Sequence, residues 1–356
     1  MARGSQELDA AAVDYVCVRI TDLSHWELSL ARFDFDLTFA AVLMHADGTV
    51  YHRYGGRGPG DASAYLSLSS LARLLRDTLG EHAAYGKQPA PPAAAPLRPA
   101  IDLPVLQRKL QQGQQINCVH CHTVNDAEHV DAVLGKRWQR DELWKFPDPA
   151  RIGVTVDREH QATVTAVAPK SPAAKAGIAR GDTLLSLGAQ RSVRSFSDVQ
   201  WALHQAAFGD NELPVRFRSG KAEIEARLDL HAGWKRCSPE DYAWRPYKWN
   251  LSPSAGFGGP PLDAASKQQL GIDTAVFAFR VQYLVDWGEN AHRGRAARAA
   301  GLQKGDVVIA FAGKSDSVSV EHFHAWVALT GTAGTDTVIV VRRGKERLAL
   351  RYALPQ

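Results

Sequence analysis

The chain has 356 residues, of which 45% are apolar and 22% are charged, and its formal net charge is +4 at pH 7. This length allows two or three domains with separate cores, and the composition is typical of globular proteins. The small, evenly spread charge indicates no nucleic-acid partner, four cysteines are too few for a disulfide framework, and no apolar run of about 18 residues could span a membrane.

Residues 15–86 predict a small α/β unit. Tyr15 to Ile20 alternates like a strand, and Phe35 to Met44 is typical of a buried one. Asp47-Gly48 is a hairpin signal that a partner strand should follow, and residues 66–83 have the pattern of an amphipathic helix. This order of elements resembles the second half of the thioredoxin fold.

The thioredoxin resemblance rests on DLTFAAVLMHADGTVYHRYGG (36–56) and departs at Leu37-Thr38, where thioredoxins carry a cis-proline. It implies a Cys-x-x-Cys upstream of every element seen here, and residues 1–86 hold no such motif. We therefore expect residues 1–86 to be a truncated thioredoxin-like domain without dithiol activity, in which Cys17 is a buried strand residue. No catalytic residue is predicted, and whether the chain is an enzyme stays open.

A Pro- and Ala-rich stretch at residues 87–100, KQPAPPAAAPLRPA, predicts a semi-rigid linker. After it, residues 101–148 contain Cys118-Val119-His120-Cys121-His122. Cys-x-x-Cys-His is the attachment signature of c-type haem, in which two thiols join the vinyl groups and the histidine becomes the proximal iron ligand. A zinc site would need a fourth ligand, and a free dithiol is the remaining alternative.

The motif therefore predicts covalent haem c on Cys118, Cys121 and His122, with zinc or no cofactor as alternatives. A sixth iron ligand could come from His129, Met44 or His160, of which His129 is the nearest in sequence to His122. Three aromatic residues of the same short segment are candidates to cover the haem: Trp138, Trp144 and Phe146.

The second half of the chain contains an internal repeat. AAKAGIARGDTLLSL (173–187) recurs as ARAAGLQKGDVVIAF (297–311), and each copy is followed by a short amphipathic helix pattern. The pattern indicates a small helix, a glycine that ends it, and a Gly-Asp turn that leads into a strand. It resembles the PDZ fold, so we expect two PDZ-like β-barrel domains, at 149–232 and at 233–356 with an insertion.

PDZ domains bind extended peptides along a sheet edge and hold the terminal carboxylate with backbone N–H groups. In the first copy, Ile152-Gly153-Val154 fits the carboxylate loop. In the second copy the best match is Gly256-Phe257-Gly258, and the insertion after it predicts weak binding or none. The expected partners are peptide or protein C-termini, although both copies could instead be packing modules.

The order of these parts resembles the Trx7/PDZ domain-containing (seleno)protein family, on the basis of the thioredoxin-like segment, NCVHCHTVNDAE (117–128) and the PDZ repeat. The resemblance implies a multidomain α+β protein with haem or redox chemistry outside the cytoplasm, although the first residues lack the apolar core of a signal peptide. We expect an extracytoplasmic c-type haem protein that docks a partner through its PDZ domains and transfers electrons to it or senses its redox state. The alternative is a peptide-binding scaffold in which the two thiols serve as a dithiol or a metal clip.

Overall fold

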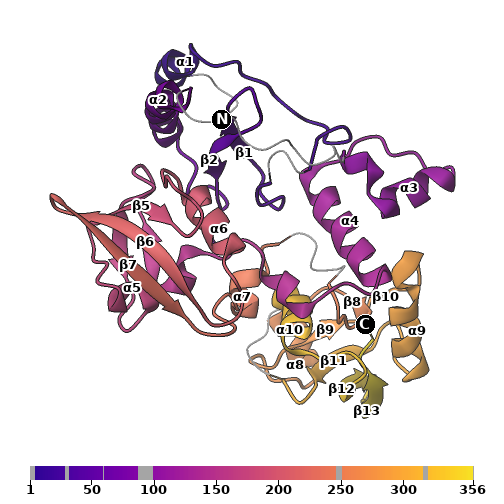
Figure 1. Ribbon diagram of the computed structural model, residues 1–356. Helices are drawn as coiled ribbons and strands as arrows, with labels where there is room; N and C mark the ends of the chain where they lie inside the picture. The colour runs from indigo at the N-terminus through magenta and orange to yellow at the C-terminus, as the bar shows by residue number, and fades with distance from the viewer. Residues whose placement is uncertain are drawn as a thin grey trace. The chain divides into compact units, whose positions relative to one another are not determined.

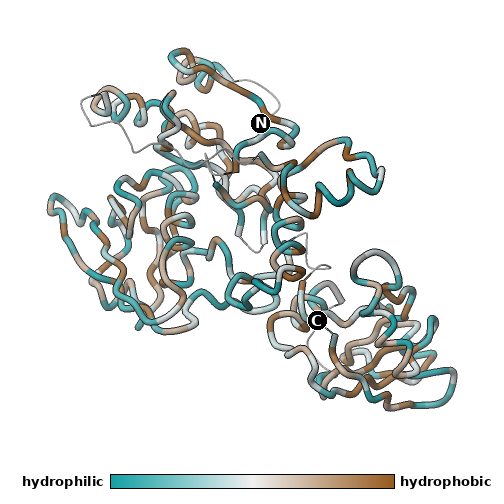
Figure 2. Tube along the Cα trace, turned by 45° about the vertical axis from the view of Figure 1, so that its right-hand side comes forward, coloured by the Kyte–Doolittle hydropathy of each residue, from teal (hydrophilic) through white to brown (hydrophobic). Residues whose placement is uncertain are grey.

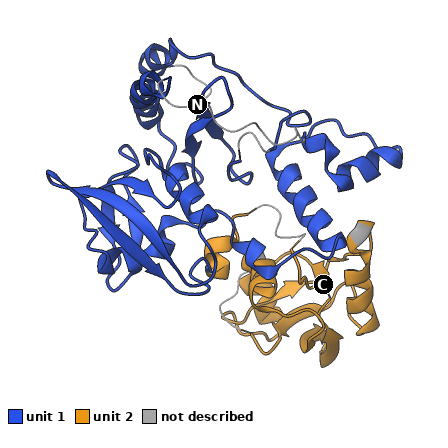
Figure 3. Ribbon diagram, in the orientation of Figure 1, with its two compact units in different colours: residues 1–237 blue, residues 238–356 orange. Residues whose placement is uncertain are grey.

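The computed structural model describes residues 5–28, 32–58, 60–86, 99–245, 251–315 and 320–355. Two compact units divide the chain, Met1–Cys237 and Ser238–Gln356, and each mixes helices with antiparallel strands (Figures 1 and 3). The linker predicted at 87–100 lies outside the described residues except for its last two positions. No helix among the described residues combines the length and the apolar character needed to cross a membrane.

The N-terminal part of the first unit is a hairpin packed on helices. Its elements are α1 (Gln6–Ala12), β1 (Ala40–Met44), β2 (Val50–Gly55) and α2 (Leu68–Tyr85). Gly48 turns the hairpin with a φ of 92°, which a glycine adopts without strain. Leu43 and Tyr54 pack on Leu71 and Leu74 of α2. The hairpin and the amphipathic helix are confirmed.

The predicted strand at residues 15–20 is wrong. The segment has no regular secondary structure, Val16 and Val18 are 94% and 75% exposed, and Cys17 is exposed rather than buried. Strand β1 begins only at Ala40, because the Asp34 carbonyl accepts a hydrogen bond from the Leu37 N–H at 3.1 Å and turns the chain before it. Among the described residues no strand pairs with 15–20, so its alternation has no sheet to stabilise it.

A helical segment follows, with a core that it shares with residues from before the linker. Its elements are η1 (Ala100–Asp102), α3 (Pro104–Gln111), α4 (Cys121–Leu134) and η2 (Arg140–Trp144). Leu103, Leu106 and Val124 pack against Leu23 and Phe35. Residues 101–148 therefore do not bury their apolar side chains alone.

The rest of the first unit holds two small sheets. Its elements are η3 (Pro149–Ile152), β3 (Val154–Val156), β4 (Val164–Val167), α5 (Pro172–Lys175), β5 (Thr183–Leu187), α6 (Phe196–Gln205), β6 (Asn211–Ser219) and β7 (Ala222–Leu230). Strands β3 and β4 form one sheet and β5, β6 and β7 the other, joined by a bridge between Thr163 and Thr183. The expected closed barrel is therefore not formed. Burial alternates along β6, and hydrophobic and hydrophilic stretches interleave along the chain (Figure 2).

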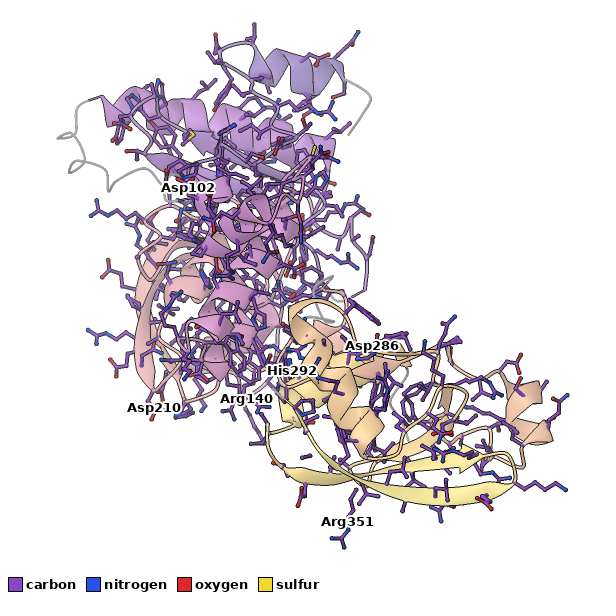
Figure 4. The ribbon with its side chains drawn as sticks, turned by 90° about the vertical axis from the view of Figure 1, so that its right-hand side faces the viewer. Asp102, Arg140, Asp210, Asp286, His292 and Arg351 are labelled. Atoms are coloured by element: carbon purple, nitrogen blue, oxygen red, sulfur yellow. The ribbon has the colours of Figure 1, made fainter. Side chains whose placement is uncertain are left out.

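The second unit has its own core around Phe257, Phe279 and Phe323. Its elements are α7 (Pro239–Tyr242), β8 (Phe257–Gly258), α8 (Ala264–Gln269), β9 (Phe279–Arg280), β10 (Tyr283–Leu284), η5 (Gly288–Asn290), α9 (Ala291–Ala299), β11 (Val307–Phe311), α10 (Val320–Thr330), β12 (Asp336–Arg343) and β13 (Glu346–Ala353). Strands β13, β12, β11 and β9 form one sheet, from which the exposed Arg351 projects outward (Figure 4).

The two repeat copies fold locally in the same way. Gly177 and Gly301 each follow the short helix with φ values of 85° and 92°. In the Gly-Asp turns, Asp182 accepts a hydrogen bond from the Ala179 N–H, and Asp306 accepts one from the Gln303 N–H, both at 2.9 Å. The helix, strand, helix and hairpin that follow one another are α5, β5, α6 and β6–β7 in the first copy and α9, β11, α10 and β12–β13 in the second.

Candidate functional site

The predicted carboxylate-binding residues lie where η3 meets β3: Ile152 ends η3, Gly153 connects the two elements, and Val154 begins β3. Gly153 has a φ of 87°, and a Cβ at this position would collide with the Ser171 side chain, so only glycine fits. Ile152 and Val154 are each 1% exposed and anchor the loop in the core. The Gly153 carbonyl accepts a hydrogen bond from the Ala168 N–H at 2.8 Å. The loop is therefore held rigidly at the start of β3.

Strand β3 offers an edge. Within residues 149–237, all of which the structure describes, it pairs with β4 and with no other strand. Helix α6 contributes Val199 and Leu203 to the same core cluster as Val154 and Val156. A strand edge beside a helix is the arrangement that receives an added peptide strand in β-augmentation.

The N-terminal turn of α6 is in contact with the end of the β2 hairpin. The Ser197 hydroxyl donates to the Gly55 carbonyl at 2.7 Å, and the Ser195 hydroxyl donates to the Arg53 carbonyl. The Asp198 carboxylate accepts hydrogen bonds from the Arg53 N–H at 3.0 Å and from His52 Nδ1 at 2.7 Å. No local pattern in the sequence predicts this contact, because its two sides lie more than 140 positions apart.

His52 is fully buried between two carboxylates. Its Nδ1 faces Asp198, which is also fully buried, and its Nε2 lies 3.0 Å from Glu81, which also binds Arg194 at 2.9 Å. Burial by itself lowers the pKa of His52, but the hydrogen bonds to Asp198 and Glu81 raise it to about 9. Burial raises the pKa of Glu81, but the hydrogen bond and charge of His52, together with hydrogen bonds from Ser192 and Arg194, outweigh burial and lower the pKa to about 2. Both ring nitrogens therefore carry protons at pH 7, and His52 is a buried cation.

The loop predicted for the second copy is more enclosed. Gly256 has a φ of 71° and is packed against the backbone of Arg293 in α9. Phe257 is 0% exposed, and Gly258 is paired with Tyr283 of β10, which belongs to the insertion. The insertion thus supplies a strand of its own beside this loop.

The cysteine–histidine motif lies at the start of α4. Helix α4 begins at Cys121, so Cys118 lies on the extended chain before it, and both thiols are unpaired. Val119 between them is 0% exposed, and its N–H donates to the Asp22 carboxylate at 3.0 Å. Burial raises the pKa of the Cys121 thiol, which therefore stays protonated at neutral pH.

Asp36 lies beside this motif, and no local pattern in the sequence predicts that position. His122 Nδ1 is 4.0 Å from Asp36 Oδ1, and the same oxygen accepts a hydrogen bond from Asn125 at 2.9 Å. Asp36 is 1% exposed, whereas the His122 side chain is 40% exposed although its Nδ1 is buried. The buried ring nitrogen of His122 thus faces a carboxylate, and the opposite part of the ring is accessible.

The other predicted haem residues are scattered. His129 follows on α4, is buried, and has Trp138 against its ring at 5.8 Å. Met44 pairs with Val50 in the hairpin, and His160 lies in the exposed loop after β3. Among the described residues no three His, Cys, Asp or Glu side chains gather as metal ligands.

Two of the aromatic residues proposed as haem cover face elsewhere. Trp144 stacks on Phe208 with ring centroids 5.7 Å apart, and Phe146 stacks on His204 of α6 at 4.2 Å. The Phe146 carbonyl also accepts a hydrogen bond from Gln200 at 3.3 Å. These two side chains therefore pack along α6 and the segment after it.

Residues 163–212 match the family model described as PDZ domain, so the chain contains one PDZ domain in this region. A solved structure described as "HtrA-type protease AlgW with decapeptide" is 15% identical, with a TM-score of 0.23. That similarity covers 40% of this chain and 48% of the other, about half of its length. No curated protein matches the chain.

Proposed function

We propose that the protein is a peptide-binding adaptor, whose first PDZ domain takes the C-terminal end of a partner along β3. The observation that carries this proposal is the glycine loop at Gly153, which leads directly into an edge strand beside α6. A peptide added to β3 would gain main-chain hydrogen bonds, and its carboxylate would meet the backbone N–H groups of the loop. The PDZ match over residues 163–212 supports the same function.

A peptide array tests this proposal. The full chain is incubated with ten-residue peptides that are printed once with free and once with amidated C-termini. We expect capture to prefer free carboxylates and to fall in Gly153→Ala, because the new Cβ would collide with Ser171 and shift the loop. Gly209→Ala is the matched control, since a Cβ there meets nothing within 4 Å. Equal capture of free and amidated ends would contradict the proposal.

We also propose that residues 233–356 form a second PDZ domain that binds weakly or not at all, and that residues 1–86 derive from a thioredoxin-like fold. The enclosed loop at Gly256 and Phe257 supports weak binding. The matching Gly-Asp turns at Asp182 and Asp306 support a common origin of the two copies. A separate substitution in each loop shows which copy captures the peptide. Equal capture by the two copies would contradict this ranking.

A second candidate function is haem c attachment at Cys118, Cys121 and His122, outside the cytoplasm. The unpaired thiols and the accessible ring of His122 fit this group, and with Asp36 beside Nδ1, the other ring nitrogen of His122 would be available to bind it. A bound haem would supply one-electron transfer to a docked partner. The two thiols would hold the group covalently, and Asp36 would orient the imidazole.

Natively matured protein tests the haem proposal. After export to a periplasm that has haem-attachment machinery, the intact mass should exceed the chain mass by one haem, and a Soret band should appear. Cys118→Ser with Cys121→Ser should remove both, whereas Cys17→Ser, at an exposed cysteine outside the motif, should remove neither. Two free thiols in the matured protein would refute attachment and leave the dithiol or zinc alternative.

A further inference from the structure

In a PDZ groove, the helix that corresponds to α6 lines one side of the bound peptide. In this protein, other residues of the same chain cover α6. All residues from Phe196 to Gln200 are buried, and so are Ala202 and Leu203. Only the last residue of the helix, Gln205, is exposed. An amphipathic helix that packs on one side of a domain core normally leaves a polar face to solvent. Another segment of the chain therefore covers the face of α6 that does not pack on the domain core.

The covering segment is residues 52–56, at the end of the β2 hairpin. As described above, its backbone carbonyls accept hydrogen bonds from Ser195 and Ser197, and its His52 is bonded to Asp198. The Arg53 guanidinium lies 3.9 Å above the ring of Trp201, further along α6. These contacts follow the helix over two turns.

Tyr65 extends the cover toward the strand side of the groove. Its ring stacks on Phe196 with centroids 3.7 Å apart, and its carbonyl accepts a hydrogen bond from Gln161 at 2.8 Å. Gln161 lies in the loop between β3 and β4 and accepts a hydrogen bond from the Phe196 N–H at 3.2 Å. Tyr65 thus contacts both α6 and the loop that follows β3.

We propose that residues 52–56 together with Tyr65 close the first PDZ groove from within the chain, so that a partner peptide binds only after this contact opens. The inference rests on the proposed peptide-binding function and adds its regulation. If the groove binds peptide only in the open form, its apparent affinity for the peptide is the intrinsic affinity multiplied by the fraction of molecules that are open.

The contact is built to open without damage to α6. Ser195 and Asp198 form a capping box, in which the Ser195 hydroxyl accepts from the Asp198 N–H at 2.9 Å and the Asp198 carboxylate accepts from the Ser195 N–H at 3.3 Å. Asp198 also accepts from the Arg194 N–H at 3.1 Å. The helix start therefore keeps its hydrogen bonds when His52 leaves, and release exposes Phe196 and Trp201 as apolar surface for a ligand.

The test compares the full chain with His52→Ala, which removes the cation of the contact, and with Arg76→Ala as control. Arg76 forms an exposed ion pair with Glu7 of α1, 3.1 Å long. Hydrogen exchange of the Arg53 amide reports opening, because that N–H is bonded to Asp198. The array of free and amidated peptides reports binding.

We expect faster exchange at Arg53 and capture of free-carboxylate peptides raised at least about tenfold in His52→Ala, with Arg76→Ala unchanged. Adding Gly153→Ala to His52→Ala should abolish the gain. Ser197→Ala, which loses a single hydrogen bond to Gly55, gives the same comparison if His52→Ala does not fold. If the wild-type chain captures these peptides as well as His52→Ala does, while the wild-type Arg53 amide stays protected from exchange, the inference is overturned. Fast exchange without capture refutes the adaptor function itself.

Discussion

Replacement of His52 by glutamine should destabilise the first unit in a manner that depends on pH. His52 has a pKa of about 9 in the fold and a reference value of 6.5. A group whose pKa is raised by folding stabilises the fold. Its full contribution is present at pH values below the reference pKa, and it is lost as the pH rises through the pKa of the folded state. For these two values, the loss between pH 7 and pH 10 is about 2.5 kcal/mol.

The measurement is the free energy of unfolding of the wild-type chain and of His52→Gln between pH 5 and pH 10. The difference should be largest at pH 5 and should shrink by about 2.5 kcal/mol between pH 7 and pH 10, where the wild-type imidazole is neutral as well. His45→Gln is the control, since this histidine lies in the same hairpin beside the partly exposed Asp47. A difference that stays constant across this range would show that folding does not raise the pKa of His52 above its reference value, and would refute the reasoning.

Three further predictions test other parts of the chain. Asp306→Ala should lower the melting temperature of the second unit more than Asp182→Ala lowers that of the first unit. Each substitution removes a turn acceptor worth about 1–2 kcal/mol, but Asp306→Ala also removes two 2.8 Å hydrogen bonds to Arg343. Equal losses of melting temperature would contradict this prediction. Cys17 should react quickly with a thiol reagent because it is exposed, and Cys17→Ser should leave the protein as inactive in insulin reduction as before. In haem-loaded protein, Asp36→Asn should raise the midpoint potential, because a nearby negative charge favours the oxidised iron, and an unchanged potential would exclude Asp36 from the site.

Local signals in the sequence determined much of the secondary structure. The Asp47-Gly48 turn, the helix over residues 68–85 and the two Gly-Asp turns appear where the residues predict them. Each depends on residues within a few positions of one another, because a left-handed glycine or an amphipathic period acts over one or two turns of chain. The glycine at position 153 was found in the same way.

Only the tertiary structure decided what lies beside each site. Tyr15 to Ile20 has the alternation of a strand but finds no partner among the described residues, since pairing depends on a neighbour that the segment does not encode. Asp36 beside His122, and His52 between Glu81 and Asp198, join positions that are 29 to 146 residues apart. A buried ion pair has no period or spacing in the sequence, because its energy arises from desolvation and from partners that only the folded chain brings together.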